Sequence, residues 1–116
     1  MGVLTTHVLD TASGKPAAGV RIELFRADDR QARLASAVTN ADGRCDEPLL
    51  TGAEFRRGEY ELVFHAGAYF AASGVEQPEP RFLDRVVIRF GIADDSQHYH
   101  VPLLISPFAY STYRGS

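Results

Sequence analysis

The chain has four histidines, and two of them, His98 and His100, are only two residues apart. Side chains with this spacing share one face of a β-strand. Histidine suits proton transfer because its unperturbed pKa is about 6.5. The pair also offers two ligands for a metal ion, but a zinc site needs at least one more ligand, and the nearest acids fall in the preceding turn. We therefore expect no metal, and we interpret His7 and His65, taken alone, as structural or exposed histidines.

Arg44 and Cys45 follow the turn Asn40-Ala41-Asp42-Gly43, in which Asp-Gly supplies the positive φ angles that tight turns need. A cation beside a cysteine lowers the pKa of the thiol and suggests a nucleophile. Neighbours in a strand point to opposite faces, however, so we predict that Cys45 is a small buried filler. The sequence shows no G-x-S-x-G elbow, no identifiable Ser-His-Asp set and no glycine-rich phosphate loop. Covalent serine chemistry therefore has little support.

The segment HYHVPLLISPFAYSTYRGS (98–116) has the pattern of an extended apolar hairpin with a polar end. Its last four residues, Tyr113-Arg114-Gly115-Ser116, carry a phenol, a guanidinium, a glycine and a hydroxyl. Chain termini are usually frayed. A strand that delivers these groups to one fixed place would instead build a binding site.

The segments that must position these residues alternate with the period of two that is typical of β-strands. The only predicted helix is Ala66–Ser73, which is alanine-rich and is followed by Gly74. The polar segment Ala27–Gln31 predicts a hairpin loop, and residues 45–58 predict a short edge segment and a loop. Short connections favour mostly antiparallel pairing. Together these features predict an all-β sandwich or barrel of about eight short strands. The clearest predicted strands are Val3–Leu9, Val20–Leu24, Ala32–Thr39, Glu59–His65 and Val86–Ile92.

The length of 116 residues predicts one domain, residues 1–116. A net charge of −3, with acidic and basic residues mixed along the chain, argues against nucleic-acid binding. The sequence shows neither an apolar run long enough for a transmembrane helix nor the pattern of a signal peptide. A single cysteine fits a reducing compartment. We therefore expect a cytoplasmic protein with no membrane or nucleic-acid partner.

Three blocks of the sequence resemble the transthyretin-like family, and within it the branch that hydrolyses 5-hydroxyisourate in purine catabolism. The blocks are LTTHVLDTASGKPA (4–17), TNADGRCD (39–46) and YHVPLLISPFAYSTYRGS (99–116). The third is similar to nearly the whole C-terminal signature of the family. The hormone-carrying branch has other residue types at the two histidine positions and the arginine position of these blocks, and it lacks the Tyr-Arg-Gly-Ser end.

The resemblance implies a two-sheet antiparallel β-sandwich of eight strands with one short helix. It also implies a homotetramer, a dimer of dimers, with active sites in clefts between the dimers. Three residues on or near the terminal hairpin, Leu104, Ser111 and Tyr113, are our candidates for contacts between subunits. The implied partners are thus the small-molecule substrate and further copies of this chain.

The implied reaction opens 5-hydroxyisourate at a cyclic amide and gives 2-oxo-4-hydroxy-4-carboxy-5-ureidoimidazoline, with no metal or other cofactor. One histidine of the pair His7 and His100 would activate water while the other orients or protonates, and the sequence leaves open which is the base. Arg44 would stabilise the oxyanion. The residues that match the family's catalytic positions are His7, Arg44, His100 and Ser116. Those expected to bind substrate are His7, Arg44, Tyr113, Arg114 and Gly115, although Arg114 has the alternative role of anchoring the tail.

Two rival interpretations remain open. The first is a transthyretin-like carrier, which would hold a small ligand in the same cleft without turnover. The second is a sandwich interaction domain in which the polar residues are incidental.

Overall fold

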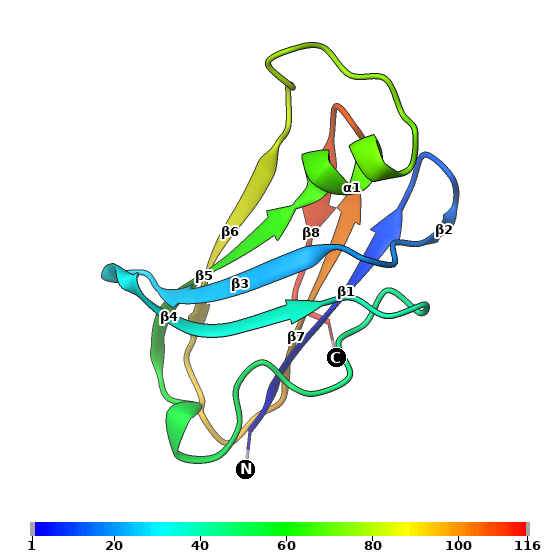
Figure 1. Ribbon diagram of the computed structural model, residues 1–116. Helices are drawn as coiled ribbons and strands as arrows, with labels where there is room; N and C mark the ends of the chain where they lie inside the picture. The colour runs from blue at the N-terminus through cyan, green and yellow to red at the C-terminus, as the bar shows by residue number, and fades with distance from the viewer. Residues whose placement is uncertain (1, 116) are drawn as a thin grey trace.

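A computed structural model describes residues 2–115, which form two β-sheets of four strands each (Figure 1). The sheets have the strand orders β2-β1-β7-β8 and β4-β3-β5-β6. One short helix, α1 (Ala66–Ala72), follows β5, and a 3-10 turn, η1 (Gly52–Glu54), precedes β5. The predicted two-sheet sandwich with one short helix is therefore confirmed. The strands are β1 (Leu4–Asp10), β2 (Lys15–Pro16), β3 (Arg21–Arg26), β4 (Asp29–Val38), β5 (Gly58–His65), β6 (Arg85–Ile92), β7 (Tyr99–Ile105) and β8 (Tyr110–Thr112).

The pairing of β1 with β7 is parallel, and among the strand pairs of residues 2–115 it is the one exception to the expected, mostly antiparallel pairing. The register runs from Leu4 opposite Tyr99 to Asp10 opposite Ile105, and the other strand pairs are antiparallel. A parallel pair needs a long connection. The whole second sheet lies between β1 and β7 in the sequence, so the chain has ample length for that connection. The short-connection argument holds only for strands that are neighbours in sequence.

This parallel pair creates the surface on which the functional residues lie. Along β1, buried residues alternate with half-buried ones, so Thr6 and Val8 face the core while Thr5 and His7 face the other side. His100 stands directly opposite Thr5 in the register. Its flanking residues in β7, Tyr99 and Val101, are buried. The outer face of the first sheet therefore brings Thr5, His7 and His100 together.

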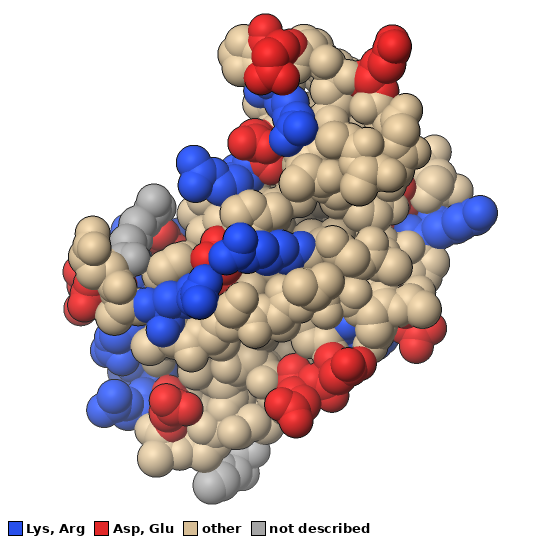
Figure 2. All heavy atoms as spheres, in the orientation of Figure 1, with Lys and Arg blue, Asp and Glu red and all other residues tan. Residues whose placement is uncertain are grey.

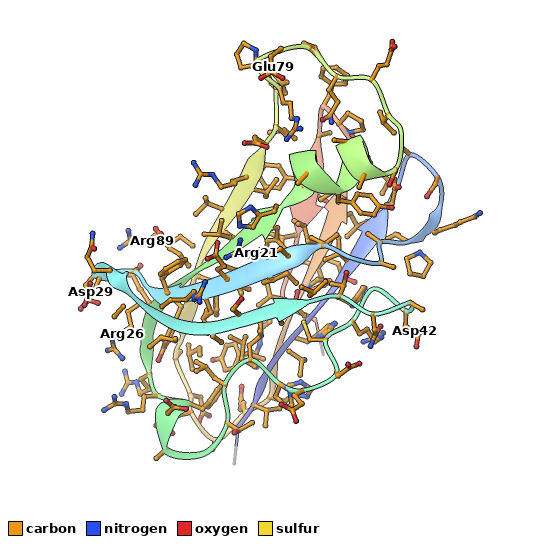
Figure 3. All side chains as sticks on the ribbon, in the orientation of Figure 1. Arg21, Arg26, Asp29, Asp42, Glu79 and Arg89 are labelled. Carbon is orange, nitrogen blue, oxygen red and sulfur yellow. The ribbon has the colours of Figure 1, made fainter. Side chains whose placement is uncertain are left out.

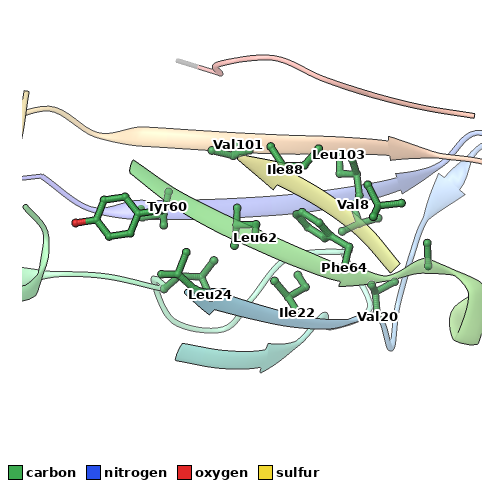
Figure 4. Packing of buried hydrophobic residues seen from close by; sticks show 14 of the residues in the cluster. Val8, Val20, Ile22, Leu24, Tyr60, Leu62, Phe64, Ile88, Val101 and Leu103 are labelled. Atoms are coloured by element: carbon green, nitrogen blue, oxygen red, sulfur yellow. The ribbon is translucent and has the colours of Figure 1, made fainter. Parts of the chain in front are cut away.

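The core lies between the two sheets, as the labelled side chains in Figure 4 show. Burying one large apolar side chain contributes roughly 1.5–3 kcal/mol. The inward-facing residues of β1 and β7 belong to this core, so packing against the second sheet holds both strands in place. The largest side chains with less than 2% exposure are Tyr60, Phe64, Phe70, Leu4, Ile22, Leu24, Leu62, Leu103, Ile105, Val8, Val20 and Val86.

One loop prediction is too long, because the hairpin turn covers only residues 27–28. β4 begins at Asp29, inside the segment Ala27–Gln31 that its polarity marked as a loop. β4 is an edge strand of its sheet, where polar side chains can face solvent, so polarity does not exclude a strand. Acidic and basic side chains are interspersed over the face seen in Figure 2. No helix within residues 2–115 is long and apolar enough to cross a membrane.

Candidate active site

Three histidines and a threonine form a continuous chain of hydrogen bonds on the outer face of the first sheet. The hydroxyl of Thr5 lies 2.8 Å from Nε2 of His98 and 2.7 Å from Nδ1 of His100. Nε2 of His100 lies in turn 2.7 Å from Nδ1 of His7. The order is therefore His98, Thr5, His100, His7. All three contacts join residues far apart in sequence, which the β1–β7 pairing brings together.

The two rings of His7 and His100 meet edge to edge. Their planes are inclined by 25° and their centroids are 4.9 Å apart. The 2.7 Å distance between Nδ1 of His7 and Nε2 of His100 is shorter than the roughly 3.5 Å of atoms in van der Waals contact. The two nitrogens therefore share one proton, as a donor and an acceptor do.

Both rings of this pair are held in the neutral form. Burial, together with the charges of His7, Arg44 and His98, lowers the pKa of His100 to about 4. Burial also lowers the pKa of His7, with a contribution from the guanidinium of Arg44. A neutral imidazole has one donor nitrogen and one acceptor nitrogen. Near neutral pH, His7 and His100 are thus equipped to accept and pass on protons.

Arg44 reaches the histidines because the turn before it is pinned to β1. The amide of Val8 donates to the carbonyl of Gly43 at 2.8 Å, and His7 and Arg44 face each other as an isolated antiparallel bridge. Gly43 has a φ of 72°, and a Cβ there would collide with the carbonyl oxygen of Val8. Only glycine fits this position. Figure 3 shows Asp42 at the outer tip of the same turn.

The C-terminal segment closes the opposite side of the histidine chain. The amide of Gly115 donates to the carbonyl of His100 at 2.7 Å. A Cβ on Gly115 would lie 2.9 Å from Cδ2 of His100, so the close approach of the segment depends on glycine. Tyr113 is 59% exposed. The described end of the chain, residues 113–115, which we call the tail, is therefore docked on the backbone of β7 through Gly115 and is not frayed there.

The side chain of Arg114 packs outside the cavity. Its guanidinium lies 4.0 Å from the centroid of the Tyr99 ring. It also donates to Oε1 of Gln97 at 2.9 Å and to the carbonyl of His98 at 3.3 Å. These contacts fasten the tail to the turn before β7. Ser116 lies outside the described residues.

The site is a surface cavity of about 510 Å³, within the roughly 300–1,000 Å³ of small-molecule pockets. Five of the seven expected site residues line it, namely His7, Arg44, His100, Tyr113 and Gly115. Within residues 2–115, no three His, Cys, Asp or Glu side chains are arranged to hold a metal ion. The full lining is Thr5, Thr6, His7, Arg44, Cys45, His98, His100, Tyr113 and Gly115.

Sequence reasoning missed Thr5 and was only partly right about Cys45, which packs half-buried against the core. Cys45 lines the cavity beside Arg44, because the two residues follow a turn rather than lie in a strand. Burial and the charge of Asp46 raise the pKa of its thiol, so the thiol stays protonated. The signal for Thr5 was its spacing: it lies two residues before His7, on the same strand face. His65, interpreted as structural, lies in the second sheet, where its Nε2 is 2.7 Å from Oε1 of Glu23 in the same sheet.

Comparisons with known proteins show the family to which the chain belongs. The family model described as the HIUase/transthyretin family matches residues 4–115. The 5-hydroxyisourate hydrolase of Pseudomonas aeruginosa is 62% identical over 117 residues, which cover 100% of this chain and 93% of that protein.

Two solved structures extend the comparison. The crystal structure of (S)-allantoin synthase matches with a TM-score of 0.93 and 48% identity; the match covers 99% of this chain but only 44% of that one. Sea bream transthyretin in complex with thyroxine matches with a TM-score of 0.84 and 30% identity, over 97% of this chain and 93% of that one. The fold thus occurs both in enzymes and in a thyroxine-binding protein. With its sequence matched from residue 4 to residue 115, this chain is a member of the HIUase/transthyretin family.

Proposed function

We propose that this chain hydrolyses 5-hydroxyisourate to 2-oxo-4-hydroxy-4-carboxy-5-ureidoimidazoline. The observation that carries the proposal is the 2.7 Å contact between the neutral rings of His7 and His100 in a cavity that also contains Arg44. Hydrolysis of a cyclic amide needs an activated water, a stabilised oxyanion and a proton for the leaving nitrogen. A histidine pair can supply the proton traffic, and a guanidinium can supply the positive charge. The name of the Pseudomonas aeruginosa relative supports the same substrate.

The hydrogen bonds favour His7 as the base. Both ring nitrogens of His100 are engaged, Nδ1 by Thr5 and Nε2 by His7. Within residues 2–115, Nε2 of His7 makes no hydrogen bond to a protein group. A base must be free to touch the proton that it removes. His7 would therefore take the proton from water through Nε2, while His100 fixes the tautomer and orientation of His7.

The other site residues have roles that follow from their positions. Arg44, exposed and opposite His7, would hold the developing oxyanion. Tyr113 offers a hydroxyl to the substrate carbonyls, and Gly115 lets the backbone approach the ring of His100 closely. We propose a catalytic role for Ser116 from the resemblance alone. For Arg114 we now favour anchoring of the tail over direct substrate contact, because its guanidinium packs on Tyr99.

We also propose that the chain acts as a homotetramer whose cavities are completed between dimers. β8 is a three-residue edge strand whose residues are exposed, and edge strands are natural places for another chain to pair. Exposed aromatic residues lie at this edge and beside it: Tyr110 is 46% exposed, Phe108 59% and Tyr113 59%. Burial against a second copy would cover them. A cytoplasmic location is proposed on the single cysteine.

The carrier interpretation rests on the likeness to sea bream transthyretin. A carrier needs a cavity but has no need of two coupled neutral histidines. The presence of His7, Arg44 and His100 in one cavity therefore favours the hydrolase.

The test is spectroscopic. 5-Hydroxyisourate is generated from urate with urate oxidase, and its ultraviolet absorbance is followed with and without the chain. We expect faster decay with the wild type, and loss of most of the acceleration in His7→Ala, Arg44→Ala and His100→Ala. His65→Gln is the matched control, because His65 lies in the other sheet and contacts Glu23. Unaccelerated decay with folded wild-type protein would refute the proposal.

A further inference from the structure

Thr5 and His98 extend the histidine pair beyond what catalysis by His7 and His100 requires. The hydroxyl of Thr5 is shared between Nε2 of His98 at 2.8 Å and Nδ1 of His100 at 2.7 Å. His98 is exposed, whereas His100 is half-buried. Three short hydrogen bonds therefore lead in series from half-buried His7 to the exposed imidazole of His98, which lines the same cavity.

When all three rings are neutral and the Thr5 hydroxyl donates within the chain, the bonds have only two arrangements. Each ring and the threonine hydroxyl have one hydrogen to donate. If Nδ1 of His7 donates to His100, then His100 donates to Thr5, and Thr5 donates to His98. If the chain is reversed, His98 donates to Thr5, Thr5 to His100, and His100 to His7. The first arrangement leaves Nε2 of His7 as an acceptor, and the second leaves it as a donor.

We propose that Thr5 and His98 complete a proton relay that carries the proton taken up by His7 to the surface of the protein. The proposal rests on the proposed hydrolysis. Nε2 of His7 takes a proton from water, and the proton on Nδ1 of His7 passes to Nε2 of His100. The proton on Nδ1 of His100 passes to the oxygen of Thr5, and the hydroxyl proton of Thr5 passes to Nε2 of His98. His98 becomes an imidazolium, and His7 is neutral again with a proton on Nε2.

The relay has an electrostatic reason. An imidazolium at His7 would lie beside the guanidinium of Arg44, and like charges at short range repel. Passing the charge to His98 moves it to an exposed side chain that water can solvate. The relay also leaves His7 as a donor, ready to protonate the leaving nitrogen. The other titratable or charged groups around the relay are Arg44, Cys45 and Tyr113 in the cavity and Arg114 behind His98.

The kinetic test uses Thr5→Val, which removes the hydroxyl and keeps the branched shape, and Thr5→Ser, which keeps the hydroxyl. We expect Thr5→Val to lower kcat by about 10-fold to 100-fold, part of the roughly 10²–10⁴ that positioned acid–base groups contribute. KM should change little, and Thr5→Ser should restore kcat. Thr11→Val is the matched control, because the Thr11 hydroxyl donates to the carbonyl of Ile105 outside the cavity.

His98→Gln tests the outer end of the relay without disturbing the core, since His98 is exposed. We expect its kcat to fall in dilute buffer and to recover as imidazole is added to the solution, because free imidazole can accept the proton in place of His98. His65→Gln should show neither effect. Wild-type kcat, within twofold, in both Thr5→Val and His98→Gln, with an unchanged pH profile, would overturn the relay.

A second readout does not depend on turnover. Nitrogen-15 NMR distinguishes protonated from unprotonated ring nitrogens, so it reports the tautomer of each histidine. We expect Thr5→Val to change the tautomer of His100, and Thr5→Ser to preserve it. If wild-type protein shows no hydrolysis, the proposed function fails while this measurement still tests the hydrogen-bond chain. An unchanged His100 tautomer in Thr5→Val would contradict the chain itself.

Discussion

Replacing Gly115 with alanine should disable the site while leaving the fold intact. The added Cβ would lie 2.9 Å from Cδ2 of His100 and 3.3 Å from both its Cβ and its carbonyl oxygen. Ordinary contacts between carbon atoms are roughly 3.5–4.0 Å. The ring of His100, or the tail, must therefore move by about 0.5–1 Å.

Neither movement is harmless to the hydrogen-bond chain. The ring of His100 is held on both sides at 2.7 Å, by Thr5 and by His7, so a shift of this size stretches one contact beyond the usual limit of about 3.2 Å. If the tail moves instead, the 2.7 Å bond from the amide of Gly115 to the carbonyl of His100 is lost. A displacement of about 1 Å in an active site can cost about 10²-fold in rate. We expect kcat/KM to fall by about 10-fold to 100-fold.

The assay is the decay of 5-hydroxyisourate absorbance, with urea unfolding as the measure of stability. Gly115 lies outside the core, so the free energy of unfolding should change by about 0.5 kcal/mol or less. Gly91→Ala is the matched control, because the nearest atom to its new Cβ is the carbonyl oxygen of Gly58 at 4.0 Å. A folded Gly115→Ala protein with more than half of the wild-type kcat/KM would refute the reasoning.

Three further predictions concern pH, the tail and assembly. The pKa of His100 is lowered from 6.5 to about 4 in the folded chain, so the unfolded chain binds more protons between these pH values. The free energy of unfolding of the wild type, relative to His100→Gln, should therefore fall as the pH drops from 6.5 to about 4. Urea titration at each pH measures it. Arg114→Ala should raise KM and loosen the tail, because a cation–π contact of about 0.5–1 kcal/mol on Tyr99 is lost. If neither KM nor the rate of proteolysis of the tail changes, the anchoring role is contradicted. Ser111→Arg on the exposed edge strand β8 should dissociate the proposed tetramer and lower activity while circular dichroism stays native; sedimentation that shows an intact tetramer would contradict this placement of the interface.

Period-two alternation was enough to predict most strands because local burial and side-chain direction are linked in a β-strand. It failed where local sequence carries no information about partners. The parallel β1–β7 pairing joins segments separated by the whole second sheet, and no turn signal marks such a pair. The same limit explains β4, whose polar first residues are compatible with a loop and with an exposed edge strand.

The active site shows the same difference between what the sequence predicts and what only the structure reveals. Resemblance pointed to His7, Arg44 and His100, and the structure brings all three into one cavity. It gave no reason to choose Thr5, because a threonine in a strand has many roles that need no ligand. Only the register, with Thr5 opposite His100, shows that its hydroxyl lies between two imidazoles. The choice of His7 over His100 as the base also needed the hydrogen-bond partners of each ring nitrogen.

The most direct measurement of the central claim is the stoichiometry of substrate consumption. 5-Hydroxyisourate is mixed with the chain in large molar excess, and the loss of its absorbance is followed to completion on a timescale short compared with spontaneous decay. A hydrolase that uses His7 as its base should consume the whole excess, and His7→Ala should not. Retention of about one equivalent per cavity, with the excess decaying at its spontaneous rate, would contradict the claim and identify a carrier.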